Sequence, residues 1–111
     1  MSKFPMAQGL KVAAVTGAGS GIGEAAAMKL AKDGFHVAVI DILSDKVSAV
    51  ARAIEAIGGQ ALALVADVRQ ADSVDRAFEA IENWRKCPDV LVNSAGIIVR
   101  GQLTTPLLSE R

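Results

Sequence analysis

Near its N-terminus the chain reads Thr16-Gly17-Ala18-Gly19-Ser20-Gly21-Ile22-Gly23, with four glycines among the last seven residues. An apolar run precedes this segment and a helical pattern follows it, which places the glycines in a strand-to-helix turn. Glycine permits positive φ and a close approach of the backbone to a ligand, and a helix N-terminus presents unpaired N–H groups and a positive dipole end. The turn therefore predicts a phosphate-binding site.

The spacing of the glycines indicates which kind of phosphate ligand the turn would bind. Gly17, Gly21 and Gly23 follow the pattern G-x-x-x-G-x-G. This is a variant of the dinucleotide fingerprint G-x-G-x-x-G, because Ile22 and Glu24 stand where that fingerprint needs glycine. The segment also lacks the Gly-Lys-Ser/Thr ending of a nucleoside triphosphate loop. The pattern favours the pyrophosphate of a dinucleotide.

Around this turn, short apolar runs alternate with helical patterns. We expect strands at residues 10–16, 36–41, 61–66 and 89–93, and helices over 21–33, from Ser44, and after a cap near Asp72. Residues 94–111 are expected to be loop, because Gly96, Gly101 and Pro106 are breakers. The alternation predicts an α/β fold with a Rossmann-type, doubly wound parallel sheet.

Connection handedness fixes the arrangement of these elements. We expect the strand order 3-2-1-4, and right-handed crossovers put the first two helices on one face of the sheet and the third on the other. The fourth strand would then be an uncovered edge. The residues expected to pack are Ile22, Ala26 and Leu30 in the first helix, Val47, Val50, Ala51, Ile54 and Ile57 in the second, and Val74, Phe78 and Ile81 with Trp84 in the third.

Composition excludes several classes of protein. Lys plus Arg equals Asp plus Glu at 12 each, so there is no excess positive charge to collect nucleic acid or an anionic membrane. No apolar stretch has the length of a membrane span or a signal peptide, and the single cysteine, Cys87, permits no internal disulfide. We expect a cytoplasmic protein. Cys87 and the lone His36 lack metal-ligand spacing and are expected to be structural, with no metal site.

The acid Asp41 ends the second predicted strand, 18 residues after Gly23. A dinucleotide-binding domain uses an acid at this place to hydrogen-bond the ribose hydroxyls of adenosine. A 2′-phosphate beside that carboxylate would meet a repulsion of about 4 kcal/mol per unit charge pair, at a separation of about 4 Å and an effective dielectric of about 20. Positions 20, 42 and 43 hold no arginine to offset it. We therefore predict NAD as the cofactor, and Ile42 is counted with Asp41 in the candidate site.

The chain resembles the N-terminal half of a short-chain dehydrogenase/reductase, and the motifs that carry the resemblance cover nearly all of it. They occur in the family's order: the turn Thr16 to Gly23 for T-G-x-x-x-G-x-G, Asp41 for the acid that selects NAD, Asp67-Val68 for the pair that contacts adenine, and Asn93-Ser94-Ala95-Gly96 for N-N-A-G. All four fall at carboxyl ends of predicted parallel strands, where open α/β sheets bind ligands.

The resemblance implies a role for each motif. The backbone near Ser20 and Ile22 would meet the pyrophosphate, Asp67 would accept from the adenine amino group, Val68 would contact the adenine ring, and Asn93 to Gly96 would line the cofactor. Ser94 departs from the family's second asparagine and is given no contact. The candidate cofactor-binding residues are Thr16, Gly17, Ser20, Gly21, Ile22, Gly23, Asp41, Ile42, Asp67, Val68, Asn93, Ala95 and Gly96.

The catalytic residues of the family are missing from this sequence. Family catalysis uses a serine, a tyrosine and a lysine four residues after the tyrosine, all beyond N-N-A-G, whereas this chain contains no tyrosine. After Gly96 the only ionisable side chains are those of Arg100, Glu110 and Arg111, which suggest no acid/base relay. We assign no catalytic residue, and we expect residues 1–111 to be an incomplete NAD-binding domain, as a fragment, a truncated product or a pseudoenzyme.

Three functions remain open at this point. The first is the cofactor half of an NAD-dependent oxidoreductase acting on an alcohol or carbonyl substrate, whose complete form is expected to be a homo-oligomer. The second is a non-catalytic NAD-binding or assembly module. The third, an S-adenosylmethionine-dependent methyltransferase, typically has an acid before its glycine turn, where this chain has Thr16.

Overall fold

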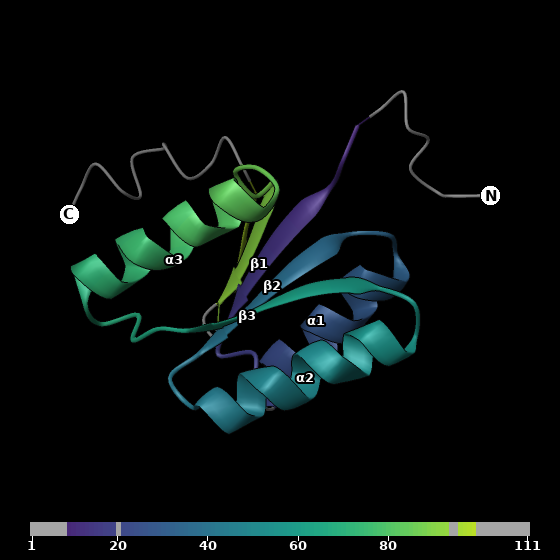
Figure 1. Cartoon of the computed structure of the whole chain (residues 1–111), viewed down its shortest axis with the longest axis horizontal. Helices are drawn as coiled ribbons and strands as arrows, with labels where there is room; N and C mark the ends of the chain where they lie inside the picture. The colour runs from purple at the N-terminus through teal and green to yellow at the C-terminus, as the bar shows by residue number, and fades with distance from the viewer. Residues whose placement is uncertain (1–8, 20, 94–95, 100–111) are drawn as a thin grey trace.

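The computed structural model describes residues 9–19, 21–93 and 96–99, with only the backbone for the last four. Strands and helices alternate along the chain, which confirms the predicted α/β class (Figure 1). The elements are β1 (Val12–Thr16), α1 (Gly21–Lys32), β2 (His36–Asp41), α2 (Ser44–Ala56), β3 (Gln60–Val65), α3 (Ala71–Trp84), β4 (Val90–Asn93) and β5 (Gly96–Val99).

The strands form one sheet in the order β3-β2-β1-β4-β5. The first four are parallel and lie in the predicted order 3-2-1-4. The fifth strand is antiparallel to β4, with Asn93 opposite Gly96 and Val90 opposite Val99. The predicted loop over 94–111 is therefore wrong at residues 96–99, and β4 is not an uncovered edge. The run Ile97-Ile98-Val99 is β-branched throughout, and such residues favour a pleated strand.

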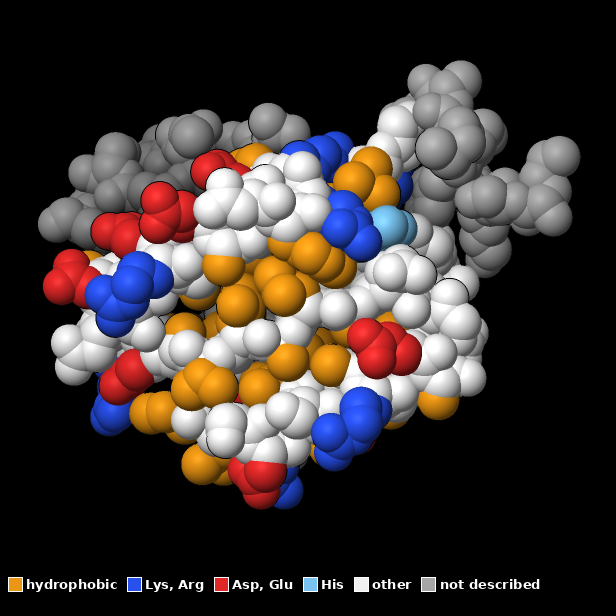
Figure 2. Space-filling model, in the orientation of Figure 1, with side chains coloured by type: hydrophobic (Ala, Val, Ile, Leu, Met, Phe, Trp, Pro, Cys, Tyr) orange, Lys and Arg blue, Asp and Glu red, His pale blue; other side chains and the backbone are white. Residues whose placement is uncertain are grey.

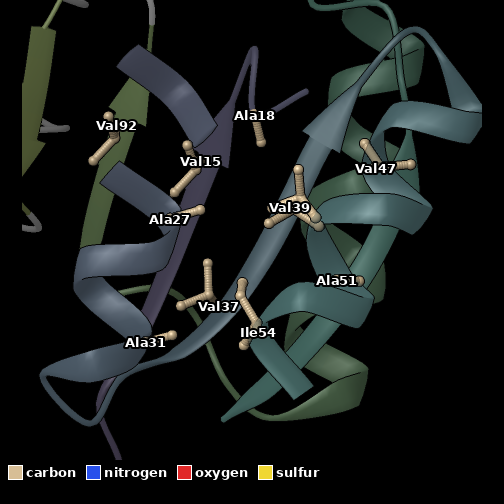
Figure 3. Packing of buried hydrophobic residues seen from close by; sticks show 11 residues of the cluster. Val15, Ala18, Ala27, Ala31, Val37, Val39, Val47, Ala51, Ile54 and Val92 are labelled. Carbon is tan, nitrogen blue, oxygen red and sulfur yellow. The ribbon is translucent and has the colours of Figure 1, made fainter. Parts of the chain in front are cut away.

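Helices cover both faces of the sheet, as predicted: α1 and α2 lie on one face and α3 on the other (Figure 1). Side chains alternate along each strand, so Val37 and Val39 of β2 pack with α1 and α2, while Ala38 and Ile40 pack with α3. Figure 3 shows the larger cluster, in which Val15, Val37, Val39 and Val92 of the sheet face Ala27, Ala31, Ala51 and Ile54 of the helices. The nearly continuous apolar sequences of β1 and β2 follow from this double coverage.

Two details of the helices correct the sequence prediction. In α1 the predicted Ala26 and Leu30 do pack against the core, but the most buried residues are Ala27 and Ala31, and the predicted Ile22 is 79% exposed. In α3 the residue before the first turn is Gln70, so Asp72 lies within the helix and is not its cap. In α2 the predicted residues are buried apart from Ile57, which follows the helix and is half exposed.

The edge strand β3 is less covered than its neighbours. Its six residues are all exposed or partly buried, and none of them is charged. Figure 2 shows hydrophobic side chains gathered along this strand, between α2 and α3. On the α3 side, Trp84 packs against the buried cluster as predicted, through contacts beside Ile81.

Candidate functional site

The glycine turn joins the end of β1 to the start of α1 at the carboxyl edge of the sheet. Gly17 and Gly21 have φ values of +65° and +60°, a left-handed conformation that L side chains rarely adopt. A Cβ built on either residue would meet nothing within 4 Å, so the space above the turn is open to a ligand. Ala18, between them, is fully buried and donates its N–H to the Ile40 carbonyl oxygen at 3.0 Å.

Glycine is needed at position 23 because of close packing and not because of an unusual backbone conformation. A Cβ placed on it would overlap the carbonyl oxygen and carbon of Gly17, so the first turn of α1 rests directly on the backbone of the glycine turn. Only glycine fits this approach. Thr16, which begins the turn, donates its hydroxyl to the Val92 carbonyl oxygen at 3.4 Å and so reaches the neighbouring strand β4.

The carboxylate of Asp41 is held at the end of β2 by two backbone donors. Its Oδ2 accepts the N–H of Gly19 at 2.9 Å, and its Oδ1 accepts the N–H of Leu43 at 3.2 Å. A Cβ on Gly19 would lie 2.8 Å from Oδ2 and 2.6 Å from the Cβ of Lys46, so glycine is needed here too. Each carboxylate oxygen keeps one lone pair for a further donor, such as a ribose hydroxyl.

A hollow of about 220 Å³ opens between the loops that follow β1, β2 and β3. It combines carboxylates with the half-exposed apolar side chains of Ile42 and Val68. Such a mixture of flat apolar surface and acceptors suits a nucleoside, whose base is apolar on its faces and polar at its edges. The lining residues are Gly17, Asp41, Ile42, Ala66, Asp67, Val68 and Arg69.

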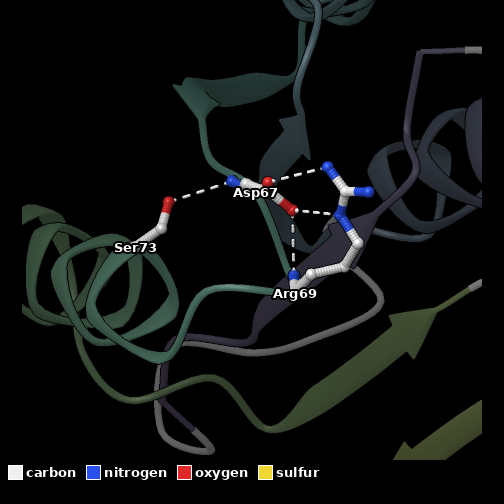
Figure 4. A network of polar contacts seen from close by, with 3 residues as sticks. All are labelled: Asp67, Arg69 and Ser73. Carbon is white, nitrogen blue, oxygen red and sulfur yellow. Dashed lines mark hydrogen bonds and ion pairs between the residues drawn. The ribbon is translucent and has the colours of Figure 1, made fainter.

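Asp67 and Arg69 form a bidentate ion pair on this wall (Figure 4). The Arg69 Nε donates to Oδ1 and its Nη2 to Oδ2, each at 3.0 Å, and the Arg69 backbone N–H also donates to Oδ1 at 3.0 Å. The side-chain hydrogen bonds from Arg69 lower the pKa of Asp67, with the backbone hydrogen bond adding to the effect. The same pairing raises the pKa of Arg69. Asp67 is therefore ionised throughout the neutral range.

The structure brings together five of the predicted residues, Gly17, Asp41, Ile42, Asp67 and Val68, around the hollow. Four others, Thr16, Gly21, Ile22 and Gly23, belong to the adjacent glycine turn. Asn93 lies opposite Gly96 where β4 pairs with β5, and Asn93 is not among the described residues that line the hollow. Ser20 and Ala95 lie outside the described residues.

Sequence reasoning missed two residues of this site. Gly19 was read only as one of several glycines, although its N–H is the donor to Asp41. Arg69 follows the third strand, whereas the cations relevant to a 2′-phosphate are expected beside the glycine turn and the second strand. Its place two residues after the Asp67-Val68 pair was the available signal.

Other kinds of site are absent from the part of the chain that the structure describes. Within residues 9–19, 21–93 and 96–99, no three His, Cys, Asp or Glu side chains gather where they could hold a metal ion. Cys87 is a partly buried free thiol. None of the described helices has the length and hydrophobicity needed to cross a membrane.

The fold and the position of the turn define a Rossmann-like α/β domain. Its hollow lies at the carboxyl ends of the parallel strands. A family model described as short chain dehydrogenase matches residues 11–109. The chain belongs to this family of oxidoreductases.

Curated relatives support the assignment. The chain is 41% identical over 91 residues to 2,3-dihydro-2,3-dihydroxybenzoate dehydrogenase of Bacillus subtilis, covering 82% of this chain and 35% of that protein. It is 44% identical over 88 residues to the short-chain dehydrogenase/reductase homolog YusS of the same organism, covering 78% of this chain and 81% of YusS. The chain thus spans about a third of the first relative but most of YusS, which is itself short.

Solved structures agree with the fold. A hydroxysteroid dehydrogenase from Escherichia coli superposes with a TM-score of 0.73 at 35% identity, over 75% of this chain and 35% of that one. L-sorbose reductase from Gluconobacter frateurii, solved with NADPH and L-sorbose, gives a TM-score of 0.70 at 34% identity, over 74% of this chain and 32% of that one. A metagenomic short-chain oxidoreductase solved with NADP gives 0.69 at 36% identity, over 73% and 37%. Nicotinamide cofactors are thus bound within this family.

Proposed function

We propose that the chain binds NAD and supplies the cofactor-binding half of an NAD-dependent oxidoreductase that acts on an alcohol or carbonyl substrate. The observation that carries the proposal is the Asp41 carboxylate, fixed by the Gly19 and Leu43 N–H groups on the wall of the hollow beside the glycine turn. The turn offers an anion site and the hollow offers a nucleoside site. A dinucleotide needs both, side by side.

In this proposal each segment holds one part of the cofactor. The turn from Gly17 to Gly23, with the N-terminus of the twelve-residue helix α1 behind it, holds the pyrophosphate. Asp41 accepts from the adenosine ribose, Ile42 and Val68 flank the adenine ring, and Asp67 accepts from its amino group. Thr16, Asn93, Ala95 and Gly96 would lie toward the nicotinamide half. When bound, the nicotinamide supplies the hydride acceptor or donor.

The preference for NAD over NADP depends on charge at the ribose. Asp41 would lie next to a 2′-phosphate. Half of a repulsion of about 4 kcal/mol would already favour NAD over NADP by more than tenfold. Arg69 is the cation on the same wall, but its guanidinium fork is already engaged by Asp67. Two similar structures hold NADPH or NADP, so the choice between cofactors within this family rests on local residues such as these.

Calorimetric titration of the 111-residue chain with NAD, NADP and S-adenosylmethionine tests the proposal. We expect NAD to bind most tightly and S-adenosylmethionine not to bind. Tighter binding of NADP would overturn the NAD assignment, and binding of S-adenosylmethionine alone would favour the methyltransferase.

The substrate class and setting of the whole protein belong to the same proposal. Acting on an alcohol or carbonyl requires a group that exchanges a proton with the substrate oxygen, which a tyrosine and a lysine beyond this segment would supply in the family pattern. We infer a cytoplasmic homo-oligomer as the complete protein. Reading the encoding DNA past Arg111 tests the expected catalytic residues, because the oxidoreductase requires a continuing frame with Tyr-x-x-x-Lys. Its absence would contradict the oxidoreductase.

A second function, a non-catalytic NAD-binding or assembly module, is favoured by one comparison. YusS is a short homolog of which this chain covers 81%, so this length occurs elsewhere in the family. NAD binding with no continuing frame beyond Arg111 would support this module.

A further inference from the structure

The proposed function gives Asp67 a contact with the adenine amino group but gives the side chain of Arg69 no contact with the cofactor. We propose that Arg69 is a positioning residue for base selection: it holds the Asp67 carboxylate so that one oxygen lone pair faces the base, and the site thereby selects a 6-aminopurine over a 6-oxopurine. The inference deepens the proposed function and rests on it.

The argument starts from the number of acceptor positions on the carboxylate. Two carboxylate oxygens offer about four lone-pair directions. Oδ1 accepts two donors from Arg69, its backbone N–H and its Nε, and is therefore filled. Oδ2 accepts only the Arg69 Nη2. One lone pair on Oδ2 remains, and its direction is set by the planar guanidinium fork.

The backbone beneath this carboxylate is also fixed. The Asp67 N–H donates to the Ser73 hydroxyl at 2.9 Å, and the Asp67 carbonyl oxygen accepts the Gln70 N–H at 2.9 Å. The preceding residue, Ala66, donates its N–H to the Asp41 carbonyl oxygen at 3.1 Å. Rotation of the Asp67 side chain is the remaining freedom, and the Arg69 fork removes it.

A fixed acceptor distinguishes two bases that have the same shape. The 6-amino group of adenine donates a hydrogen bond to a carboxylate oxygen, whereas the 6-oxo group of hypoxanthine presents a second acceptor and is repelled. A carboxylate that could rotate would turn away from the oxo group and lose part of this discrimination. The Arg69 side chain is 78% exposed and the Asp67 side chain 22%, and both residues line the hollow, so the pair lies where the base would bind.

The experiment compares NAD with nicotinamide hypoxanthine dinucleotide on the full 111-residue chain, by calorimetry at neutral pH. The variants are Arg69→Gln, which removes the charge and the fork, and Arg69→Lys, which keeps the charge without the fork. Arg76→Gln is the matched control, since Arg76 is an exposed arginine on α3 outside the hollow. Urea unfolding of each variant checks that the fold is intact.

We expect the unaltered chain to prefer NAD by about tenfold, the worth of one hydrogen bond to a charged acceptor. Arg69→Gln should weaken NAD by about two- to fivefold, the range for an exposed ion pair, and leave the hypoxanthine dinucleotide unweakened, so the preference narrows. Arg69→Lys should fall between the two, because a single ammonium cannot reproduce the fork. Arg76→Gln should match the unaltered chain.

Several results would overturn the inference. Equal weakening of both dinucleotides by Arg69→Gln would reveal a purely structural role, and an unchanged preference would show no role at all. NADP is titrated against the same variants: if Arg69→Gln weakened the binding of NADP more than that of NAD, Arg69 would contact the 2′-phosphate and would not position Asp67. If the unaltered chain bound no NAD, the proposed function would fail and this inference with it, whereas NAD binding without an effect of Arg69 removes the inference alone.

Discussion

The backbone N–H of Gly19 lies 2.9 Å from Oδ2 of Asp41, so one hydrogen bond joins the glycine turn after β1 to the last residue of β2. The contact places the anion site and the ribose site in a fixed relation. A Cβ on Gly19 would lie 2.8 Å from the same oxygen, which ties the glycine to the acid.

Asp41→Ala should weaken NAD binding by about tenfold, the worth of a hydrogen bond to a charged acceptor. It should also narrow the difference in affinity between NAD and NADP. Asp41→Asn, which keeps one acceptor oxygen, replaces the other with an NH2 donor and removes the charge, should also narrow the difference in affinity between NAD and NADP. Calorimetric titration measures both. Asp45→Ala, a loss of the same charge from an exposed position in α2, is the control and should change neither affinity. An unchanged difference in Asp41→Ala would contradict the role of this carboxylate.

Gly23→Ala should destabilise the fold by roughly 1 to 3 kcal/mol, the usual cost of overpacking. In most helices alanine is more favourable than glycine by about 1 kcal/mol, so the sign itself is diagnostic. The reversal is expected because the added methyl group would overlap the Gly17 carbonyl. Urea unfolding measures the change, with the exposed neighbour substitution Glu24→Ala as control. A Gly23→Ala protein as stable as the parent would show that the turn can move away.

The free energy of unfolding should fall as the pH drops from 7.5 to 5.5, because the single histidine, His36, becomes protonated. Partial burial lowers the pKa of His36 from its usual value, and the nearby positive charge of Arg85 lowers it further. Its Nδ1 accepts the Arg85 Nε–H at 2.8 Å, and its ring lies 6.1 Å from the Trp84 ring. The unfolded chain therefore binds a proton at His36 more readily than the folded chain does. The contribution of neutral His36 to the free energy of unfolding is complete above about pH 6.5, and it is lost as the pH falls toward the pKa of His36 in the folded chain.

Urea midpoints across this pH range measure the effect. His36→Gln, which cannot titrate, should flatten the dependence, since the carboxylates titrate mainly at lower pH. A slope that persists in His36→Gln would assign it to another group.

The 111-residue chain should not interconvert any alcohol and ketone with NAD, even where it binds the dinucleotide. It contains no tyrosine, and a positioned acid/base contributes about 10² to 10⁴ in rate. The measurement is NADH absorbance over a panel of alcohols and ketones, with protein freed of host dehydrogenases. Turnover above that of a Gly17→Ala/Gly21→Ala control would contradict the prediction.

Much of the fold could be predicted from sequence because local pattern and chain topology agree. The strand His36–Asp41 was predicted at its observed bounds, since charged or glycine-rich segments flank a run of apolar residues. The order β3-β2-β1-β4 is that of the doubly wound fold, and crossover handedness then fixes which face of the sheet each helix covers. The strand Gly96–Val99 was missed because glycine was weighed as a breaker above the three β-branched residues that follow it.

The site was less predictable, because its parts meet only in space. Asp41 could be predicted from its distance along the chain to the glycine turn. The fork from Arg69 to Asp67 depends on a tight loop that brings residues 67 and 69 together, and its position beside Asp41 depends on the pairing of β2 with β3. Neither relation can be read from residue spacing in a single sequence.

The N–H groups of Ala18 and Ala66 continue the hydrogen bonding of the parallel ladder past the strand ends, reaching the carbonyl oxygens of Ile40 and Asp41. Folding has thus already met the entropy cost of ordering these connections, and an arriving dinucleotide does not have to shape them. We therefore expect capture of the proposed dinucleotide at this edge to be limited by diffusion and orientation and not by a slow closing step. Substitutions along the edge should act chiefly on how long the complex lasts and much less on how quickly it forms.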